Sequence, residues 1–409
     1  MLKQFLTSFN GLRAHKKLFW FSGALVVSLL SASVSFVTEG VSNLLARPPL
    51  EAFSNEIISL ALKANDFRDK GTDFPAEKFV IIEMDDASIE KLGRINQWPR
   101  AFDAEVIRYI SSGNPSLIIP DLLYTESDTL PSYYKEILTF RGIPDPGKVI
   151  SGLSTDDVLA DAIDESGRVI LSFYDDDINQ YSSAAESELK LLPGIYTDRS
   201  SGKYLNKLLN PVLPRPYFLS KALAAGSISM FSGHDGVVRT YPLIQALPEN
   251  NMTDKDKIRT TANISLLAAV FLMESKPADI TFDGRDLAIG KKVNVPVNAR
   301  AEMTMCFPGM DEGFRKISFY KVLENRMPAE FFENKVVYIG ATASGVEDLK
   351  TTPVGEKVPG VYIHVAALFN LLNRQFIREI EPGRIIMLNL VITLFLSLLF
   401  IKARPITSV

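Results

Sequence analysis

Two uncharged apolar stretches near the ends of the chain constrain its fold more than any other feature of the sequence. Residues 18–38 and 385–401 contain no Asp, Glu, Lys or Arg. At a rise of about 1.5 Å per residue, the first is long enough to cross a hydrocarbon core of roughly 30 Å, and the second is near the short end of the spanning range. A buried helix of a soluble core usually shows a polar face. We therefore predict transmembrane helices at residues 18–38 and 384–402.

The basic residues next to these stretches predict the orientation of the chain. The first stretch is preceded by basic residues and no acidic one, namely Lys3, Arg13, Lys16 and Lys17. The second stretch is followed by Lys402 and Arg404. Because such positive flanks stay on the cytoplasmic side, residues 1–17 and 403–409 are predicted to be cytoplasmic. Residues 39–383 then form a domain outside the cytoplasm.

A cleaved signal peptide is the alternative interpretation of residues 18–38. The small residues Ser31, Ala32 and Ser33 resemble a cleavage site. The apolar run, however, exceeds the about 7–15 residues that are usual in a signal peptide. We therefore favour an uncleaved membrane anchor.

Charge and composition exclude several function classes. The net charge is −4 and no basic block is present, so a nucleic-acid partner is not expected. Cys306 is the only cysteine, which rules out a disulfide framework and a cysteine-rich metal site. The histidines His15, His234 and His364 lack metal-ligand spacing. No metal and no cofactor are predicted, and Cys306 is expected to fill the core.

Short apolar runs alternate with helical patterns between the two stretches. Residues 79–84 and 116–120 are typical of buried strands, and residues 101–112 between them show a helical apolar face. This order predicts a βαβ unit. Further strands are predicted at 168–174, 237–243, 279–289, 301–307 and 335–340, and further helices at 50–63, 156–165, 259–273 and 361–373.

The predicted fold is therefore α/β, with a mainly parallel, doubly wound sheet outside the cytoplasm and a transmembrane helix on either side. Segments 125–155 and 174–215 are rich in Ser, Pro, Gly and Asp, which is typical of insertions or long loops.

Polar residues follow several of the predicted strands directly. Asp85 and Asp86 follow the first, Asp121 the second, and Thr342 the strand at 335–340. If these strands are parallel neighbours, their carboxyl ends meet at one edge, where open α/β sheets bind ligands. Asp85 and Asp86 could bind a cationic or hydroxylated ligand, or could cap a helix that starts near Ser88. A divalent cation is conceivable there, although nothing in the sequence demands one.

Other polar residues are more simply explained as internal partners. Arg100 follows Trp98 and Pro99, and we expect it to pair with Asp85 or Asp121 rather than with a ligand. Arg239 follows a turn at Asp235–Gly236 and is also expected to have an internal partner.

Asp348, Thr352 and His364 form the last candidate group. Thr352 begins a TPVG stretch that should form a rigid loop over the sheet edge. His364 is expected to be neutral and packed, although a pH-sensing role is possible for an imidazole. The candidate ligand-binding residues are thus Asp85, Asp86, Arg100, Asp121, Arg239, Thr342, Asp348, Thr352 and His364.

Several blocks of the sequence together resemble the second class of CHASE domains, which are extracellular sensors of bacterial signalling proteins. The blocks are VIIEMDDASIEKLG (80–93), QWPR (97–100), SLIIPDLLY (116–124), HDGVVRTYPL (234–243), residues 317–355, and PGVYIHVAALFNLL (359–372). The likeness runs through most of residues 60–380. It implies a location in the bacterial inner membrane, with the main domain periplasmic or extracellular.

Members of that family usually carry several spans after the sensor and then a cytoplasmic cyclase or kinase. Too few residues follow the second predicted span here to form such a module, so we expect no catalytic activity from this chain itself. It could be a piece of a longer protein, a sensor whose output is a separate chain, or a remnant. The resemblance implies as partners the lipid bilayer, an unknown small-molecule or ionic ligand, and either a second copy or a cytoplasmic signalling protein.

The leading functional hypothesis is a sensor in which binding at the sheet edge shifts the helix at 361–373 and, through residues 378–383, the second span. An envelope hydrolase using Asp85, Asp121 and His364 is the alternative enzyme hypothesis. It lacks a GxSxG elbow, a P-loop and a zinc signature. A scaffold for another membrane protein is a third hypothesis, which an exposed apolar patch would favour.

Overall fold

The computed structural model describes residues 74–402 except for 129, 143, 146–154, 177–183, 249–255, 308–313, 346–347 and 379–381. The chain divides into two units, one made of residues 56–378 and the other of residues 1–55 and 379–409. The first unit is called the body below. In the second unit, the helix α13 (Pro382–Lys402) is described. The predicted helix at 50–63 and the predicted span at 18–38 lie outside the described residues.

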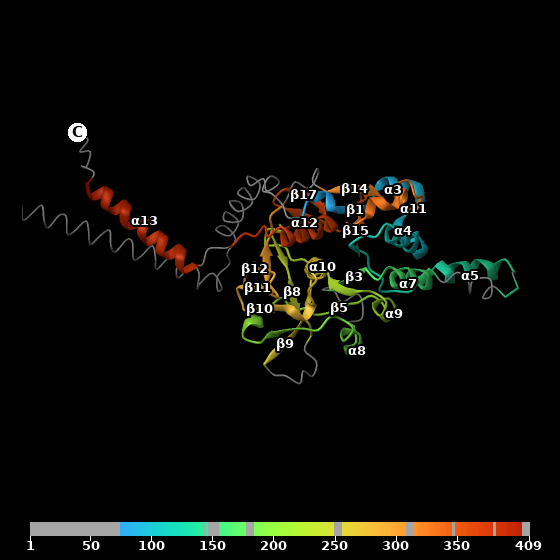
Figure 1. The fold of residues 1–409 in the computed structure, drawn as a ribbon, viewed down its shortest axis with the longest axis horizontal. Helices are drawn as coiled ribbons and strands as arrows, with labels where there is room; N and C mark the ends of the chain where they lie inside the picture. The colour runs from blue at the N-terminus through green and yellow to red at the C-terminus, as the bar shows by residue number, and fades with distance from the viewer. Residues whose placement is uncertain are drawn as a thin grey trace, which may run out of the picture. The chain divides into compact units, whose positions relative to one another are not determined.

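A parallel sheet runs through the body (Figure 1). Its strands lie in the order β14 (Arg315–Ser318), β1 (Phe79–Met84), β15 (Val336–Ala341) and β2 (Leu117–Pro120), and every neighbouring pair is parallel. A parallel bridge between Ile118 and Val169 extends the sheet toward β3 (Ile170–Asp175), which pairs in parallel with β6 (Ala224–Ser227).

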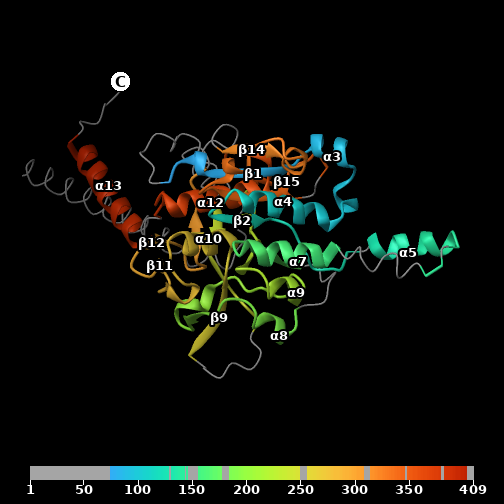
Figure 2. The same cartoon turned by 45° about the vertical axis from the view of Figure 1, so that its right-hand side comes forward.

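Helices cover both faces of this sheet because the strand side chains alternate between two hydrophobic clusters. Phe79 and Ile81 pack with α10 (Ile264–Leu272) and α12 (Gly360–Leu372). Val80 and Ile82 point the other way, toward α4 (Arg100–Ser112), α7 (Thr155–Ser166) and α11 (Phe319–Leu323). Figure 2 shows α4 and α7 side by side. The predicted parallel sheet with helices on both faces is therefore confirmed.

The predicted elements of the first βαβ unit are confirmed as β1, α4 and β2. The two strands are not neighbours, however, because β15 lies between them and pairs with both. The predicted elements at 156–165, 168–174, 335–340 and 361–373 are confirmed as α7, β3, β15 and α12. Their apolar patterns are long or strong enough to fix the element type locally.

The predicted helix at 259–273 is wrong in its first part. Residues Lys257–Ala262 form the strand β9, and the helix α10 begins only at Ile264. The strand pairs antiparallel with β4 (Ile195–Asp198) on one side and β8 (Ile244–Ala246) on the other. Its β-branched residues Ile258, Thr260 and Thr261 suit this central position, where tertiary pairing decides the conformation.

Antiparallel elements surround the parallel sheet and were not predicted as such. The predicted strand at 237–243 shortens to β7 (Thr240–Pro242), which pairs with β13 (Glu302–Thr304), the strand found within 301–307. The predicted strand at 279–289 is a hairpin of β10 (Ile280–Phe282) and β11 (Asp286–Ile289), and β12 (Val293–Pro296) pairs with β11. Gly284 turns this hairpin with a positive φ of 98°.

The two segments predicted as insertions or long loops also contain regular structure. The first holds α5 (Leu130–Phe140), which extends away from the other helices in both views (Figures 1 and 2). The second holds β4, α8 (Glu186–Leu189) and β5 (Pro211–Val212). The remaining short elements are α3 (Asp86–Leu92), α9 (Pro216–Leu219), β16 (Leu349–Thr352), β17 (Gly355–Pro359) and 3₁₀ turns at Ala76–Lys78, Ile95–Gln97, Ser201–Tyr204, Pro277–Asp279 and Ala329–Phe332.

Within the described ranges, no helix has the combination of length and apolarity needed to cross a membrane. The predicted transmembrane helices and the domain boundaries drawn from them therefore stay predictions.

Contact between β15 and α12 depends on a glycine. A Cβ atom added at Gly340 would lie 2.7 Å from the Cβ atom of Val361. We expect Gly340→Ala to lower the free energy of unfolding by about 1–3 kcal/mol, as overpacking does. Denaturant unfolding of the detergent-solubilised chain measures this change.

The double variant Gly340→Ala/Val361→Gly should lose less stability than the sum of the single variants, because the clash is gone. Gly355→Ala is the control, since its added Cβ atom would meet Val358 at an ordinary 3.4 Å. Additive effects of the two substitutions would show that this packing contact is not made.

Candidate functional site

The carboxyl ends of β1, β15 and β2 meet at one edge of the sheet, which is called the rim below. The strands β1 and β2 each pair in parallel with β15, so the residues that follow the three strands lie at the same edge. Backbone hydrogen bonds continue past the strand ends: the Asp121 N–H donates to the Ile339 carbonyl over 2.7 Å, and the Thr342 N–H donates to the Met84 carbonyl over 3.2 Å. The strand order therefore brings Asp85, Asp121 and Thr342 to one edge of the sheet, as the predicted site required.

Asp85 caps the helix α3. One carboxylate oxygen accepts hydrogen bonds from the Ser88 backbone N–H at 2.8 Å and from the Ser88 hydroxyl at 2.6 Å. The other accepts from the Ser318 hydroxyl at 2.6 Å. Burial alone would raise the pKa of Asp85, but the hydrogen bonds from Ser318 and Ser88 hold this pKa below 3.8. The structure thus supports the capping role for Asp85.

Asp86 ties the start of α3 to the loop after β15. Its two carboxylate oxygens accept from the Ser344 backbone N–H at 2.9 Å and from the Ser344 hydroxyl at 2.8 Å. Gly345 follows with a positive φ of 87°, which lets the loop turn at this point. Both carboxylates of the Asp85–Asp86 pair therefore hold the rim together internally.

Arg100 has an internal partner, but it is neither Asp85 nor Asp121. Its guanidinium forms an ion pair with Asp156 at 2.5 Å and also donates to the Glu126 carbonyl. Arg215 binds the second oxygen of Asp156 at 2.8 Å. Arg100 is the first residue of α4, and α4 packs against α7, whose first turn carries Asp156. The predicted partners were wrong because helix packing, rather than the strand ends, places this guanidinium.

Arg239 pairs with Asp235 through two parallel hydrogen bonds of 2.9 and 2.7 Å. The hydrogen bond from Arg239 is the main cause that holds the pKa of Asp235 below 3.8. Gly236 between them has a positive φ of 76°, as the predicted turn requires. The expectation of an internal partner for Arg239 is confirmed.

Thr352 closes a β-hairpin rather than an irregular loop. Its hydroxyl donates to the Gly355 carbonyl at 3.1 Å and accepts from the Gly355 N–H at 3.2 Å. These bonds fix the turn between β16 and β17, which pair antiparallel. The Thr352 side chain thus satisfies backbone groups of the turn, while the rigidity of the TPVG stretch stays a prediction.

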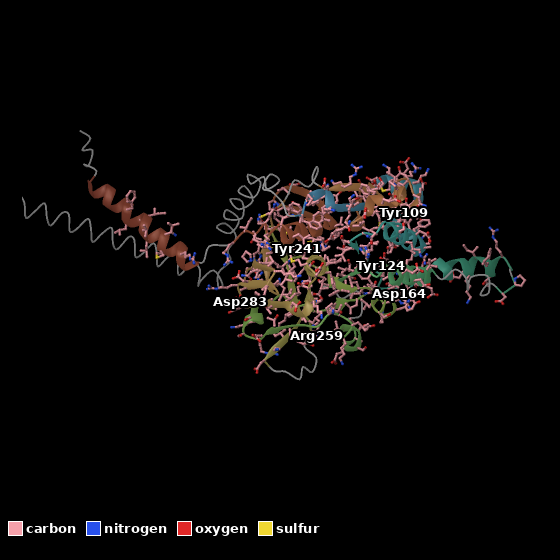
Figure 3. All side chains as sticks on the ribbon, in the orientation of Figure 1. Tyr109, Tyr124, Asp164, Tyr241, Arg259 and Asp283 are labelled. Atoms are coloured by element: carbon pink, nitrogen blue, oxygen red, sulfur yellow. The ribbon has the colours of Figure 1, made fainter. Side chains whose placement is uncertain are left out.

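His364 lies in α12 and is 1% exposed. Its Nδ1 atom is 2.6 Å from the hydroxyl of Tyr241, which Figure 3 labels inside the body. The same hydroxyl bonds Asn263 and lies 2.7 Å from the Ser265 hydroxyl, which donates to the His364 carbonyl at 2.8 Å. Burial lowers the pKa of His364 to about 4. The prediction of a neutral, packed histidine is confirmed.

The hydrogen-bond arrangement also assigns the tautomer of His364. The side-chain NH₂ of Asn263 donates to the Ser229 carbonyl at 3.4 Å, which turns the Asn263 carbonyl oxygen toward Tyr241. Tyr241 therefore donates its single hydroxyl hydrogen to Asn263 and must accept from His364. His364 consequently carries its hydrogen on Nδ1, and its Nε2 atom is an acceptor.

Asp121 differs from the other rim carboxylates. Burial raises its pKa to about 7, and the negative charge of Asp348 acts in the same direction against the positive charge of Lys350. Asp348 forms an ion pair with Lys350 at 3.1 Å. The Asp348 carboxylate lies close to Gly360, the first residue of α12. A Cβ atom added at Gly360 would be 2.0 Å from one of the carboxylate oxygens.

Tyr338 completes this group from β15. Its side chain is fully buried, and its hydroxyl has no hydrogen-bond partner within the described part of the chain. Burial raises the pKa of Tyr338, the nearby Ser265 hydroxyl acts in the opposite direction, and the charge of Asp121 adds to the effect of burial. Asp121, Tyr338, Tyr241, His364, Asp348 and Lys350 are called the Asp121 cluster below.

A second carboxyl with a raised pKa, that of Asp103, lies in the first turn of α4 and is not one of the rim candidates. Burial raises the pKa of Asp103 to about 7, although Tyr124 and Arg100 act in the opposite direction. Figure 3 labels Tyr124 at a different place in the body from Tyr241. The Arg100 guanidinium lies over the Tyr124 ring, 5.6 Å from its centroid. This group packs α4 against the start of α7.

Sequence reasoning missed Tyr241, Tyr338, Ser265, Asn263 and Lys350. Tyr338 gave a usable signal, since a tyrosine inside the aliphatic run KVVYIG must place a hydroxyl in or near the core. The other four residues become site residues only through contacts between distant elements.

The three residues of the hydrolase hypothesis are not assembled as a catalytic set. Asp85 is engaged by Ser88 and Ser318, and His364 by Tyr241. Among the residues that the structure describes, no group of three or more His, Cys, Asp or Glu side chains could hold a metal ion. Neither hydrolytic geometry nor a metal site thus emerges from the described rim.

Comparison with known proteins gives one match. The family model for the CHASE2 domain matches residues 41–399. No curated protein and no solved structure matches the chain.

The pKa of Asp121 leads to a prediction about pH. A carboxyl that titrates at about 7 when folded and near 3.8 when unfolded loses stabilisation as the pH rises through this window. Asp121→Asn removes that loss, so the stability of the variant relative to the wild type should rise between pH 4 and pH 7.5. Denaturant unfolding at several pH values measures the difference.

Asp283→Asn is the control, and its stability relative to the wild type should change with pH in the opposite direction. The reason is that backbone hydrogen bonds from Asp286 and Arg285 hold the pKa of Asp283 below 3.8. The wild-type His364 acts oppositely to Asp121, since its stabilising effect is lost as the pH falls from 6.5 to about 4. A difference between Asp121→Asn and wild type that does not change with pH would contradict a raised pKa of the half-buried Asp121 carboxyl.

Proposed function

Because this chain belongs to the CHASE2 domain family, we propose that it is a membrane-anchored sensor of a bacterial signalling system. The family is one of extracellular sensory domains, so the body lies outside the cytoplasm and α13 anchors it in the inner membrane. A ligand bound at the rim shifts the body between two arrangements. The signal leaves through the membrane helices toward a second copy or a separate cytoplasmic protein.

The observation that carries this proposal is the course of α12. The helix begins at Gly360, beside Asp348 of the Asp121 cluster, and it contains His364. Directly after its last residue, the side-chain amide of Asn373 accepts from the Phe74 N–H at 2.7 Å and donates to the Phe74 carbonyl at 2.9 Å. One helix thus connects the rim to Phe74, the first residue of the body that the structure describes.

Burial supports a rigid movement of α12. Nearly the whole helix is buried between α10 and β15, so a displacement at Gly360 moves its far end as well. Near that end, Asn370 exchanges two hydrogen bonds of 2.8 and 2.9 Å with the Cys306 backbone. Arg378 then pairs with Asp286 at 2.8 Å. A ligand shifts this connected element only if it binds the two arrangements with different affinities.

Exposed apolar side chains of α13 support its place in a bilayer. The exposed large hydrophobic residues of this helix are Met387, Leu388, Val391, Ile392, Leu394 and Phe395. The stretch 385–401 carries no charge, and basic residues flank it. In water such a surface is unfavourable, whereas lipid satisfies it.

Labelling of single cysteines tests the placement of the body. The only native cysteine, Cys306, is buried and should not react. We expect a membrane-impermeant maleimide to label Ala278→Cys, an exposed position of the body, in intact bacterial cells whose outer membrane has been permeabilised. Ser8→Cys, near the N-terminus, should react only after the inner membrane is opened. The reverse labelling pattern would overturn the proposed orientation.

Removal of the Asn373 side-chain amide tests the link between the end of α12 and Phe74. Asn373→Ala leaves the partly buried Phe74 N–H and carbonyl groups without this partner, so the free energy of unfolding should fall by about 1–3 kcal/mol. Amide hydrogen exchange should become faster at residues 74–79 in particular. Asn294→Ala, an exposed strand position, is the control. Unchanged hydrogen exchange at residues 74–79 would show that the Asn373 side chain does not hold Phe74 against the end of α12.

A further inference from the structure

We propose that the Asp121 cluster binds the ammonium group of a small organic amine, with the Asp121 carboxylate and the Tyr338 hydroxyl as its direct contacts. This inference rests on the proposed sensor function and names the ligand class of the same site.

The strand register brings the two contact groups to one place. Tyr338 of β15 lies opposite Ile119 of β2. Asp121 is two residues beyond Ile119, and side chains two apart in a strand point to the same face. That face is the one covered by α10 and α12, since Ile119 and Tyr338 belong to the same hydrophobic cluster as those helices. The charge of Asp121 acts on the Tyr338 hydroxyl, so the two groups lie near each other.

Asp121 is the rim carboxylate without hydrogen-bond donors. Asp85 accepts from Ser88 and Ser318, and Asp86 accepts from Ser344 twice. No hydrogen bond or ion pair to the Asp121 side chain occurs within the described ranges, although the residue is half-buried. A carboxylate held in the structure without donors is therefore open to a donor from outside the chain.

Tyr338 provides the second, independent observation. Its side chain is 0% exposed, yet its hydroxyl has no partner among the described residues. The Ser265 hydroxyl lies near it, but Ser265 donates its hydrogen to the His364 carbonyl at 2.8 Å. The Tyr338 oxygen is therefore left without a donor among the described residues, although nearly all buried side-chain polar atoms in proteins have a hydrogen-bond partner. The nearby Tyr241 hydroxyl, in contrast, contacts Asn263, Ser265 and His364.

The charges around Asp121 select a cation. The cluster holds the carboxylates of Asp121 and Asp348 and one ammonium, that of Lys350, which pairs with Asp348 at 3.1 Å. His364 is neutral because burial lowers its pKa to about 4. Ionised Asp121 is thus an unpaired negative charge, which a cationic ligand neutralises and an anion would not.

Hydrogen-bond geometry favours an organic ammonium over a metal ion. A metal would need several ligating side chains, and no suitable group of three exists in the part of the chain that the structure describes. An ammonium has three donors and no acceptor. One donor satisfies the Asp121 carboxylate and a second satisfies the Tyr338 oxygen, which leaves the organic part of the ligand at the rim.

The experiment measures amine binding to the full chain in detergent micelles by thermal shift and titration calorimetry at pH 8. The probes are ethanolamine and 1,4-diaminobutane, with ethylene glycol and 1,4-butanediol as neutral compounds of similar shape, all at equal ionic strength. We expect at least one amine to raise the unfolding midpoint saturably, while the diols leave it unchanged.

Variants then locate the binding. Asp121→Asn should weaken amine affinity roughly tenfold or more, because a charge-assisted hydrogen bond is lost. Tyr338→Phe should weaken it severalfold. This variant is expected to fold, since the hydroxyl that it removes has no partner within the described residues. Asp161→Asn, an exposed acidic position of α7, is the matched control and should bind like the wild type.

The absence of a saturable shift with both amines would overturn the proposal, as would equal shifts with the diols or wild-type affinity in both Asp121→Asn and Tyr338→Phe. These failures differ from a failure of the sensor function itself. The cysteine labelling pattern reports the orientation of the body independently of any ligand, so a correct pattern without amine binding removes only this ligand class.

Discussion

The insertion of β15 between β1 and β2 is the pairing on which the rest of the body depends. It brings the carboxyl ends of β1 and β2 to the same edge although the two strands do not touch each other. It also places Tyr338 beside the strand that ends at Asp121. Gly340, two residues further along β15, lets Val361 of α12 approach the sheet at a distance that any side chain would block. The sheet order, the rim and the position of α12 thus follow from one central strand.

Most polar groups at the rim serve to hold it in one shape. Asp85, Asp86 and Thr352 each make at least two hydrogen bonds, which for Thr352 lie within its own turn and for Asp85 and Asp86 also reach distant segments. Such satisfied groups stiffen the edge, because breaking any one of them leaves a partner unpaired. Asp121 and Tyr338 depart from this pattern. Proteins keep unsatisfied buried groups mainly where function requires them, which is why these two residues carry the ligand proposal.

The buried network around His364 links the rim to the interior without charge. A neutral imidazole, two hydroxyls and an amide share hydrogen bonds between α10, β7 and α12. The pKa of about 4 keeps His364 uncharged near neutral pH. Any role of this residue in pH sensing would therefore lie well below neutrality. At the far end of α12, Asn373 exchanges two hydrogen bonds with the Phe74 backbone.

The sequence by itself determined the local elements with strong apolar patterns, among them β1, α4, β15 and α12, and it placed Asp85, Asp121 and Thr342 at strand ends. These follow from periodicity within a single segment. It also carried the resemblance to the sensor family, which the match over residues 41–399 confirmed. The neutral state of His364 followed from its position in an apolar helix.

Only the tertiary structure decided which segments meet. The strand β9 lies where helical periodicity was predicted, because pairing with β4 and β8 outweighs the local pattern. Arg100 binds Asp156 because α4 packs on α7, which no spacing within the sequence reveals. The meeting of Asp121 with Tyr338 depends on strand order across residues far apart in the chain. A hydrogen bond or a desolvated charge is a property of two groups in space, so the sequence names the groups and the fold selects the pairs.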